Sequence, residues 1–181
     1  EASEVLTCSF TTGNAQIDDG PAGTGTLLSP RVWMAVGTIS NFTALAVVKT
    51  LTWGTPTAGY VLGGMAMGRS FDSDNAADAH VFGRYRDSAA ANTLRWITYD
   101  SDGPSETTQG SITLAQNTNL WLMFIRAGDT AAAYYRTTSP TPTDNSFTLL
   151  ASASATGAGD WTNAYTVGLL AGENGNSDGT V

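Results

Sequence analysis

Hydrophobic and polar residues alternate in short segments along most of the chain. Segments with this strand pattern lie near residues 5–10, 26–36, 42–50, 59–68, 79–86, 94–100, 109–114, 120–127, 130–136, 147–152 and 164–171. Clusters of Gly, Pro, Asn, Asp and Ser separate them, and few stretches keep apolar positions at the helical period. The pattern predicts an all-β protein built as an antiparallel sandwich or barrel.

The segment at 120–127 is apolar on both faces from Leu120 to Ile125, as in a strand covered on both sides. The turn Ala127-Gly128-Asp129 then leads into the segment at 130–136, which predicts a hairpin. We expect Trp121 and Trp33 to be core residues, because sandwiches bury many aromatic side chains.

A second hairpin is predicted from 79 to 100. Phe82, Arg84 and Arg86 alternate with Val81, Gly83 and Tyr85, so the three share one face of their strand. A pair of arginines is costly to bury without acidic or carbonyl partners. We therefore expect this face to meet solvent, a ligand or a partner chain.

Composition and charge narrow the class of protein. The 181 residues fit one domain over 1–181, which can be a piece of a larger polypeptide. Acidic residues outnumber basic ones by 16 to 8, giving a net charge of −8, so a basic footprint for nucleic acid is missing. No apolar run reaches the ~20 residues of a membrane span, and insertion into a membrane is not expected. Cys8 is the only cysteine, which excludes an internal disulfide.

The order of several segments resembles the concanavalin A-like lectin and glucanase superfamily, in particular its non-catalytic, laminin-G-like modules. The resemblance rests on a Gly-Thr-Leu-Leu strand entry within 26–36, on Ala58–Met67, on the hairpin at 120–136, on 147–150 with Trp161, and on Tyr165–Gly172. It implies a jelly-roll sandwich of two antiparallel sheets. Such modules close with a further strand, whereas this chain ends at 178–181. Truncation, residues 1–10 or another chain could account for that strand.

Enzymatic activity is not expected. Catalytic members of the superfamily carry a Glu-x-Asp-x-Glu-like run, and none of the four glutamates (Glu1, Glu4, Glu106 and Glu173) lies in one. The run Gly175–Gly179 matches a nucleophile-elbow pattern, which requires a following helix, but the given sequence has only two more residues and His80 is distant in sequence. We interpret that run as a turn.

Two groups of residues are candidates for binding. Asp72, Asp74 and Asp78 could offer oxygen ligands to Ca²⁺, or they could form a solvated acidic turn. Aromatic and forked polar side chains could form a carbohydrate platform, or the aromatic ones could be core residues. These platform candidates are Phe82, Arg84, Arg86, Trp96 and Trp53.

The leading functional hypothesis is a non-catalytic recognition module that binds glycan on a cell or particle surface. The rival is a structural subunit of a virion or other surface assembly, such as a decoration, fibre or capsid-associated protein, which would form homo-oligomers or larger assemblies. A glycoside hydrolase is disfavoured. We expect the chain to be located outside the cell, on a cell surface or on a virion surface.

Overall fold

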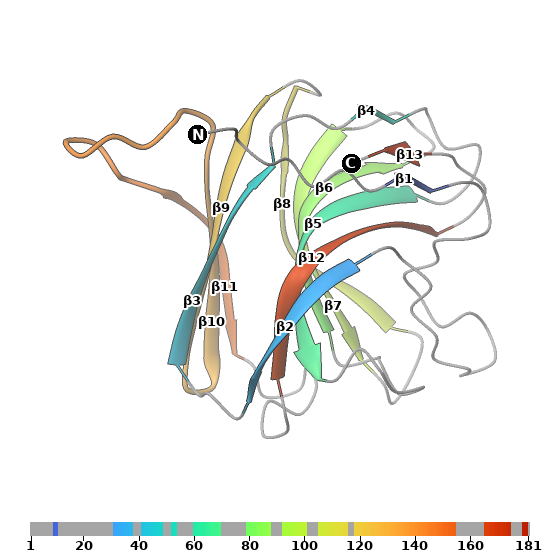
Figure 1. Ribbon diagram of the computed structural model, residues 1–181, viewed down its shortest axis with the longest axis horizontal. Helices are drawn as coiled ribbons and strands as arrows, with labels where there is room; N and C mark the ends of the chain where they lie inside the picture. The colour runs from blue at the N-terminus through green and yellow to red at the C-terminus, as the bar shows by residue number, and fades with distance from the viewer. Residues whose placement is uncertain are drawn as a thin grey trace.

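The computed structural model describes residues 9–10, 31–37, 41–48, 52–53, 60–69, 79–87, 92–100, 105–115, 118–154, 165–174 and 179–180 (Figure 1). Within these ranges the chain forms strands and no helix, so no helix is long and apolar enough to cross a membrane. The strands are β1 (Ser9–Phe10), β2 (Arg31–Gly37), β3 (Asn41–Val48), β4 (Thr52–Trp53), β5 (Tyr60–Arg69), β6 (Ala79–Asp87), β7 (Asn92–Asp100), β8 (Ser105–Thr113), β9 (Leu120–Ala127), β10 (Thr130–Arg136), β11 (Thr148–Ser154), β12 (Tyr165–Asn174) and β13 (Gly179–Thr180).

Two antiparallel sheets form the body of the protein. One has the strand order β11-β10-β9-β3 and the other β2-β12-β5-β6-β7-β8. Figure 1 shows them stacked face to face, with the four-stranded sheet on the left. The prediction of an all-β sandwich of two antiparallel sheets is confirmed.

The hydrophobic core lies between these sheets. Phe82 and Trp96 face it from the six-stranded sheet, and Phe124 packs edge-on against Trp96 with ring centroids 5.3 Å apart. Along β9, buried residues alternate with half-buried ones, so Leu120, Leu122 and Phe124 face inward. Removing each such side chain from water contributes about 2 kcal/mol to stability, and this packing holds the sheets together.

The middle of the six-stranded sheet is buried on its other face as well. Leu62, Val81, Tyr85 and Ile97 point away from the core, yet none is more than 7% exposed. Figure 1 places a small sheet, with the order β1-β13-β4, on that side of the molecule. β4 and β13 were not predicted from the sequence.

The β13 strand lies in the small sheet, between β1 and β4. Gly179 pairs with Phe10 of β1 and with Trp53 of β4, so residues near both ends of the chain lie in one sheet. The structure therefore places Ser9 and Phe10 beside Thr180 and Gly179.

Both predicted hairpins are present. β9 and β10 have the predicted boundaries, and Gly128 in the turn between them has a φ of 59°, a left-handed conformation that suits glycine. β6 and β7 pair with Phe82 opposite Trp96. These pairings fix the faces on which the candidate residues lie.

Candidate functional site

The aromatic residues of the predicted platform lie in the core. Phe82 and Trp96 each have no exposed surface, and they pair across β6 and β7 on the face that meets the other sheet. The prediction that they could be exposed to a ligand is wrong, because that face is the inner face of the sandwich. The alternative, that these aromatics belong to the core, is confirmed for both.

Arg84 is also internal, with 2% of its surface exposed. Its guanidinium donates one hydrogen bond to the carbonyl oxygen of Ala115, at 2.9 Å, and another to that of Thr118. Burial lowers the pKa of Arg84 from its ordinary value. The expectation that this face meets solvent, ligand or partner is therefore wrong at Arg84, because two main-chain carbonyls compensate the buried charge. Arg86, at the end of the same face, is half-buried.

His80 lies on the same inner face and is 3% exposed. Its Nδ1 accepts a hydrogen bond from the Trp96 indole Nε1 at 3.1 Å, which leaves the ring proton on Nε2. Burial, and secondarily the positive charge of Arg126, lowers the pKa of His80 to about 3. His80 is thus a neutral, buried residue at physiological pH.

The remaining predicted residues are described only in part or not at all. Trp53 is in the strand β4, and its side chain lies outside the described residues. Asp72, Asp74 and Asp78 also lie outside them. Calcium binding by these three stays a prediction, which loss of thermal stability on chelation would test.

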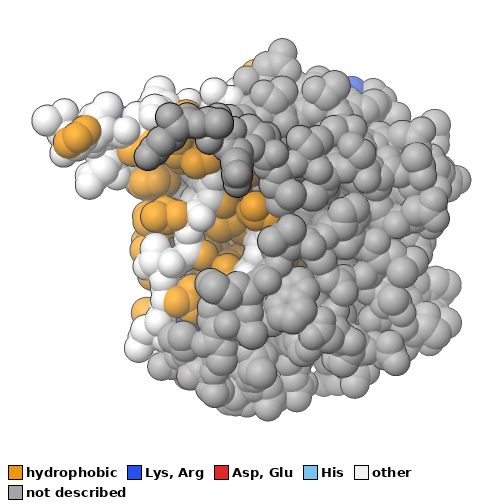
Figure 2. Space-filling model, viewed as in Figure 1, with side chains coloured by type: hydrophobic (Ala, Val, Ile, Leu, Met, Phe, Trp, Pro, Cys, Tyr) orange, Lys and Arg blue, Asp and Glu red, His pale blue; other side chains and the backbone are white. Residues whose placement is uncertain are grey.

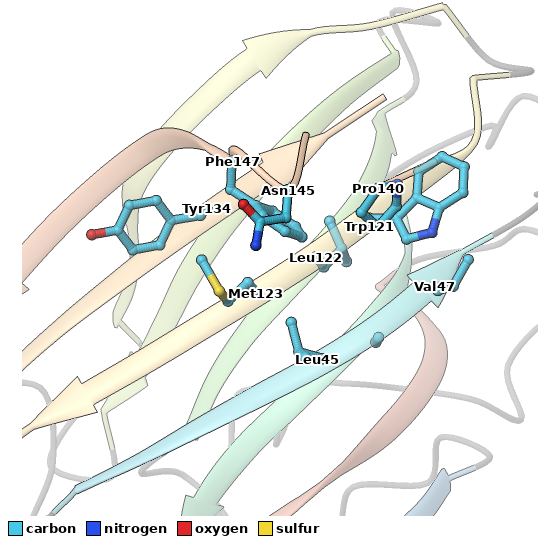
Figure 3. A pocket seen from close by; sticks show the side chains of 10 residues that line it. Leu45, Val47, Trp121, Leu122, Met123, Tyr134, Pro140, Asn145 and Phe147 are labelled. Carbon is cyan, nitrogen blue, oxygen red and sulfur yellow. The ribbon is translucent and has the colours of Figure 1, made fainter. Parts of the chain in front are cut away.

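A different feature has the properties of a binding site. An open cleft of about 600 Å³ lies on the outer face of the four-stranded sheet, away from the core (Figure 3). Strands β3, β9 and β10 form its floor, and residues 137–147, here called the β10–β11 loop, form a wall. The described residues that line it are Leu45, Ala46, Val47, Trp121, Leu122, Met123, Tyr134, Pro140, Asn145 and Phe147.

The strand register brings the floor together. Met123 of β9 lies opposite Leu45 of β3 on one side and Tyr134 of β10 on the other. Two residues along β9, Trp121 lies opposite Val47. Because alternate residues share a face, all five side chains point outward from the same surface. Figure 2 shows hydrophobic side chains gathered over this sheet, at the base of the protruding loop.

The β10–β11 loop is held in place by a network around Arg136 and Asp144. The Arg136 guanidinium donates to both carboxylate oxygens of Asp144, at 2.7 and 3.0 Å, and its Nε donates to the carbonyl of Thr138 at 2.8 Å. Ser146 donates its hydroxyl to Asp144 at 2.8 Å. The hydrogen bonds from Arg136 and then Ser146 hold the pKa of Asp144 well below its usual range. The wall of the cleft is thus a formed structure, although the loop is exposed.

The prediction was wrong for Trp121. It was expected in the core, but it is half-buried on the outer face and lines the cleft. The signal was present in the sequence: β9 is apolar on both faces, and only one face packs against the other sheet. Apolar side chains on the outward face, such as Trp121 and Met123, indicate that another segment or a ligand packs there.

Solved structures share this fold at low sequence identity. A functionally unknown protein from Saccharomyces cerevisiae matches with a TM-score of 0.64 and 12% identity, over 99% of this chain and 88% of that one. A xylan β-1,4-xylosidase from Bacillus halodurans C-125 matches with a TM-score of 0.58 and 11% identity, over 86% of this chain and 30% of that one. The xyloglucan PUL GH43B protein of Bacteroides ovatus matches with a TM-score of 0.54 and 13% identity, over 99% and 38%.

The likeness to these structures shows the fold alone. No protein-family model matches the sequence, and no curated protein is similar enough in sequence to match it. The chain spans 30% of the xylosidase and 38% of the Bacteroides protein, so it resembles one part of each.

Proposed function

We propose that the chain is a non-catalytic recognition module that binds glycan in the cleft on the outer face of the four-stranded sheet. The observation that carries the proposal is that Trp121, Tyr134 and Phe147, which the core does not use, line one cleft together with Asn145. An aromatic ring stacks on the apolar C–H face of a sugar, and an amide orients the hydroxyl groups. Ligand sites generally combine such an apolar lining with a few placed polar groups.

The chemistry of the lining favours binding over hydrolysis. Glycoside hydrolysis uses two carboxyl groups that flank the scissile bond. None of the described lining residues is acidic, and the carboxylate of Asp144 in the β10–β11 loop is engaged by Arg136. We also propose that the chain is related to the concanavalin A-like modules and that it is located outside the cell, on a cell or particle surface.

The proposal is tested by screening the protein against an array of glycans and measuring the binding of the hits by calorimetry. Replacing Trp121 or Tyr134 by Ala should abolish or strongly weaken binding and leave the circular dichroism spectrum unchanged. Leu169→Ala is the matched control, because Leu169 is also an exposed hydrophobic residue but belongs to β12 of the other sheet. Binding that survives both cleft variants would refute the assignment of the site.

A structural subunit is the second candidate, and one observation favours it. Leu149 on β11, opposite Tyr134 and outside the cleft lining, is 51% exposed, and it adjoins a cleft whose residues Leu45 and Val47 are 68% and 49% exposed. An apolar surface that extends beyond a cleft suits a partner protein or a second copy. Sedimentation of the protein over a range of concentrations separates the two functions. Self-association that Leu45→Asp abolishes, without binding to any glycan, would favour the structural subunit.

A further inference from the structure

We infer that the cleft accepts an uncharged glycan chain and rejects acidic glycans. The inference rests on the proposed function and names the class of ligand for that same site. Arg84, one of the predicted platform residues, is enclosed in the core and offers no charge to a ligand.

The first argument is the absence of charge from the described lining of the cleft. The floor presents Trp121, Met123 and Leu45, and the wall presents Pro140, Asn145 and Phe147. A carboxylate or sulfate held against these side chains would lose hydration and gain no cation in return. An uncharged sugar loses much less, because its C–H face is itself apolar and its hydroxyl groups can stay in water at the open side.

The second argument concerns Arg136, which lies opposite Trp121 in the register of β9 and β10. A guanidinium there could have served as a clamp for an acidic sugar. Its Nη1 and Nη2 donate to the two carboxylate oxygens of Asp144, and its Nη1 also donates to the Ser146 carbonyl at 3.0 Å. Its Nε donates to Thr138. These bonds occupy most of the five guanidinium N–H groups, so Arg136 builds the wall and offers no binding charge.

The third argument is the shape of the floor. Trp121 and Tyr134 lie on neighbouring strands and are offset by two residues, because Tyr134 pairs with Met123. Such diagonal neighbours are about 7–8 Å apart in a sheet, and Met123 neighbours both, opposite Tyr134 and two residues along β9 from Trp121. This strip of apolar side chains is longer than one ring and suits consecutive sugars of a flat, β-linked chain whose rings expose their C–H faces.

Asn145 supplies the polar contact that such a ligand requires. Figure 3 shows its amide at the cleft beside Phe147, on the side of the loop that faces the sheet. A side-chain amide both donates and accepts hydrogen bonds, so it can bind a sugar hydroxyl as donor or as acceptor. Because the amide is uncharged, it does not favour an anionic ligand. The net charge of −8 adds long-range repulsion against acidic chains.

The experiment compares neutral and acidic oligosaccharides of equal length by calorimetry, at low and at high salt. Cellohexaose and xylohexaose are the neutral probes, and hexamers of galacturonic acid and of hyaluronan are the acidic ones. We expect binding of a neutral probe that salt leaves unchanged, since no ion pair contributes to it. Trp121→Ala should weaken that binding by about tenfold or more, and Asn145→Ala by about threefold to tenfold.

A designed gain of function sharpens the test. Leu45 is exposed at the edge of the cleft, so Leu45→Lys should fold normally and should create salt-dependent binding of the acidic probes. Leu45→Gln is the matched neutral control and should not bind them.

The failures of the two proposals are distinguishable. Tighter binding of an acidic probe by the unmodified protein, lost in Trp121→Ala, would overturn the inference and leave the proposed function standing. Absence of binding to any probe and to any glycan on the array would overturn the proposed function itself. Trp121→Phe, which keeps an aromatic ring, should retain part of the binding, and this variant guards against misfolding of Trp121→Ala.

Discussion

The indole Nε1 of Trp96 donates a hydrogen bond to Nδ1 of His80 inside the sandwich, across neighbouring strands of the six-stranded sheet. This bond satisfies the polar atom of a tryptophan that has no exposed surface. It requires a neutral imidazole, because a protonated ring has no acceptor nitrogen. Protonation of His80 would therefore break the bond and leave a charge in the core next to Arg126.

Stability should fall in acid partly through His80. The pKa of His80 is about 3 in the folded state, against an ordinary value of 6.5. Between these two values the unfolded chain binds more protons than the folded one, so the free energy of unfolding decreases as pH falls. The contribution is at most about 1.4 kcal/mol per pH unit. Urea unfolding across this range should show a shallower decline in His80→Gln, which does not titrate. Equal slopes in both proteins would mean that His80 does not sense pH.

Loss of Arg84 should destabilise the protein. Arg84→Ala leaves the carbonyls of Ala115 and Thr118 without their buried donor, and it opens space between the sheets. We expect a loss of about 2–4 kcal/mol in the free energy of unfolding, measured with denaturant. Arg95→Ala is the control. Arg95 stacks on Tyr85, with its guanidinium carbon 3.6 Å from the ring centroid, and lies 3.7 Å from Asp87, contacts that contribute about 1 kcal/mol or less each. An Arg84 variant as stable as the control would indicate that Arg84 is not a structural anchor.

Local patterns predicted the strands well, and long-range contacts decided where the candidate residues lie. The boundaries of β9 and β10 follow from an apolar run and a glycine turn a few residues apart. The burial of Arg84 depends on carbonyls 31 and 34 residues away in sequence, which the alternation along β6 cannot reveal. The alternation of side chains along β6 showed that Phe82 and Arg84 share a face of the strand. It did not show which face lies toward the core. The cleft escaped prediction because its wall comes from a loop whose fold depends on Arg136 meeting Asp144.

Gly83 should tolerate no side chain. A Cβ there would stand 2.7 Å from Gly64 Cα and would also meet the carbonyl of Gly63, so the clash is with backbone of the paired strand. Gly83→Ala should cost about 1–3 kcal/mol, as overpacked core positions do, or prevent folding. Gly128→Asn is the control, since nothing lies near a Cβ at Gly128 and Asn tolerates its positive φ. Thermal unfolding of both variants measures the difference. A Gly83 variant as stable as the original protein would show that β5 and β6 can separate at this point.

The ion pair between Arg136 and Asp144 should affect ligand binding more than stability. Asp144→Asn removes the charge that draws both guanidinium nitrogens into the loop, and it weakens the acceptor used by Ser146. The β10–β11 loop should then move away from the floor of the cleft, which weakens glycan binding several-fold because the ligand must order the loop again. The melting temperature should change little, because Asp144, the residue that is changed, is exposed on a loop outside the core.

The measurements are calorimetric affinity and the rate of proteolysis within residues 137–147. Asp129→Asn is the matched control: it removes the same charge from an exposed position in the turn between β9 and β10, and no described residue of that turn lines the cleft. The control should leave both measurements unchanged. Unaltered affinity and proteolysis in Asp144→Asn would show that the loop keeps its shape without the ion pair. A large fall in melting temperature would instead show that Asp144 supports the sandwich and not only the cleft wall.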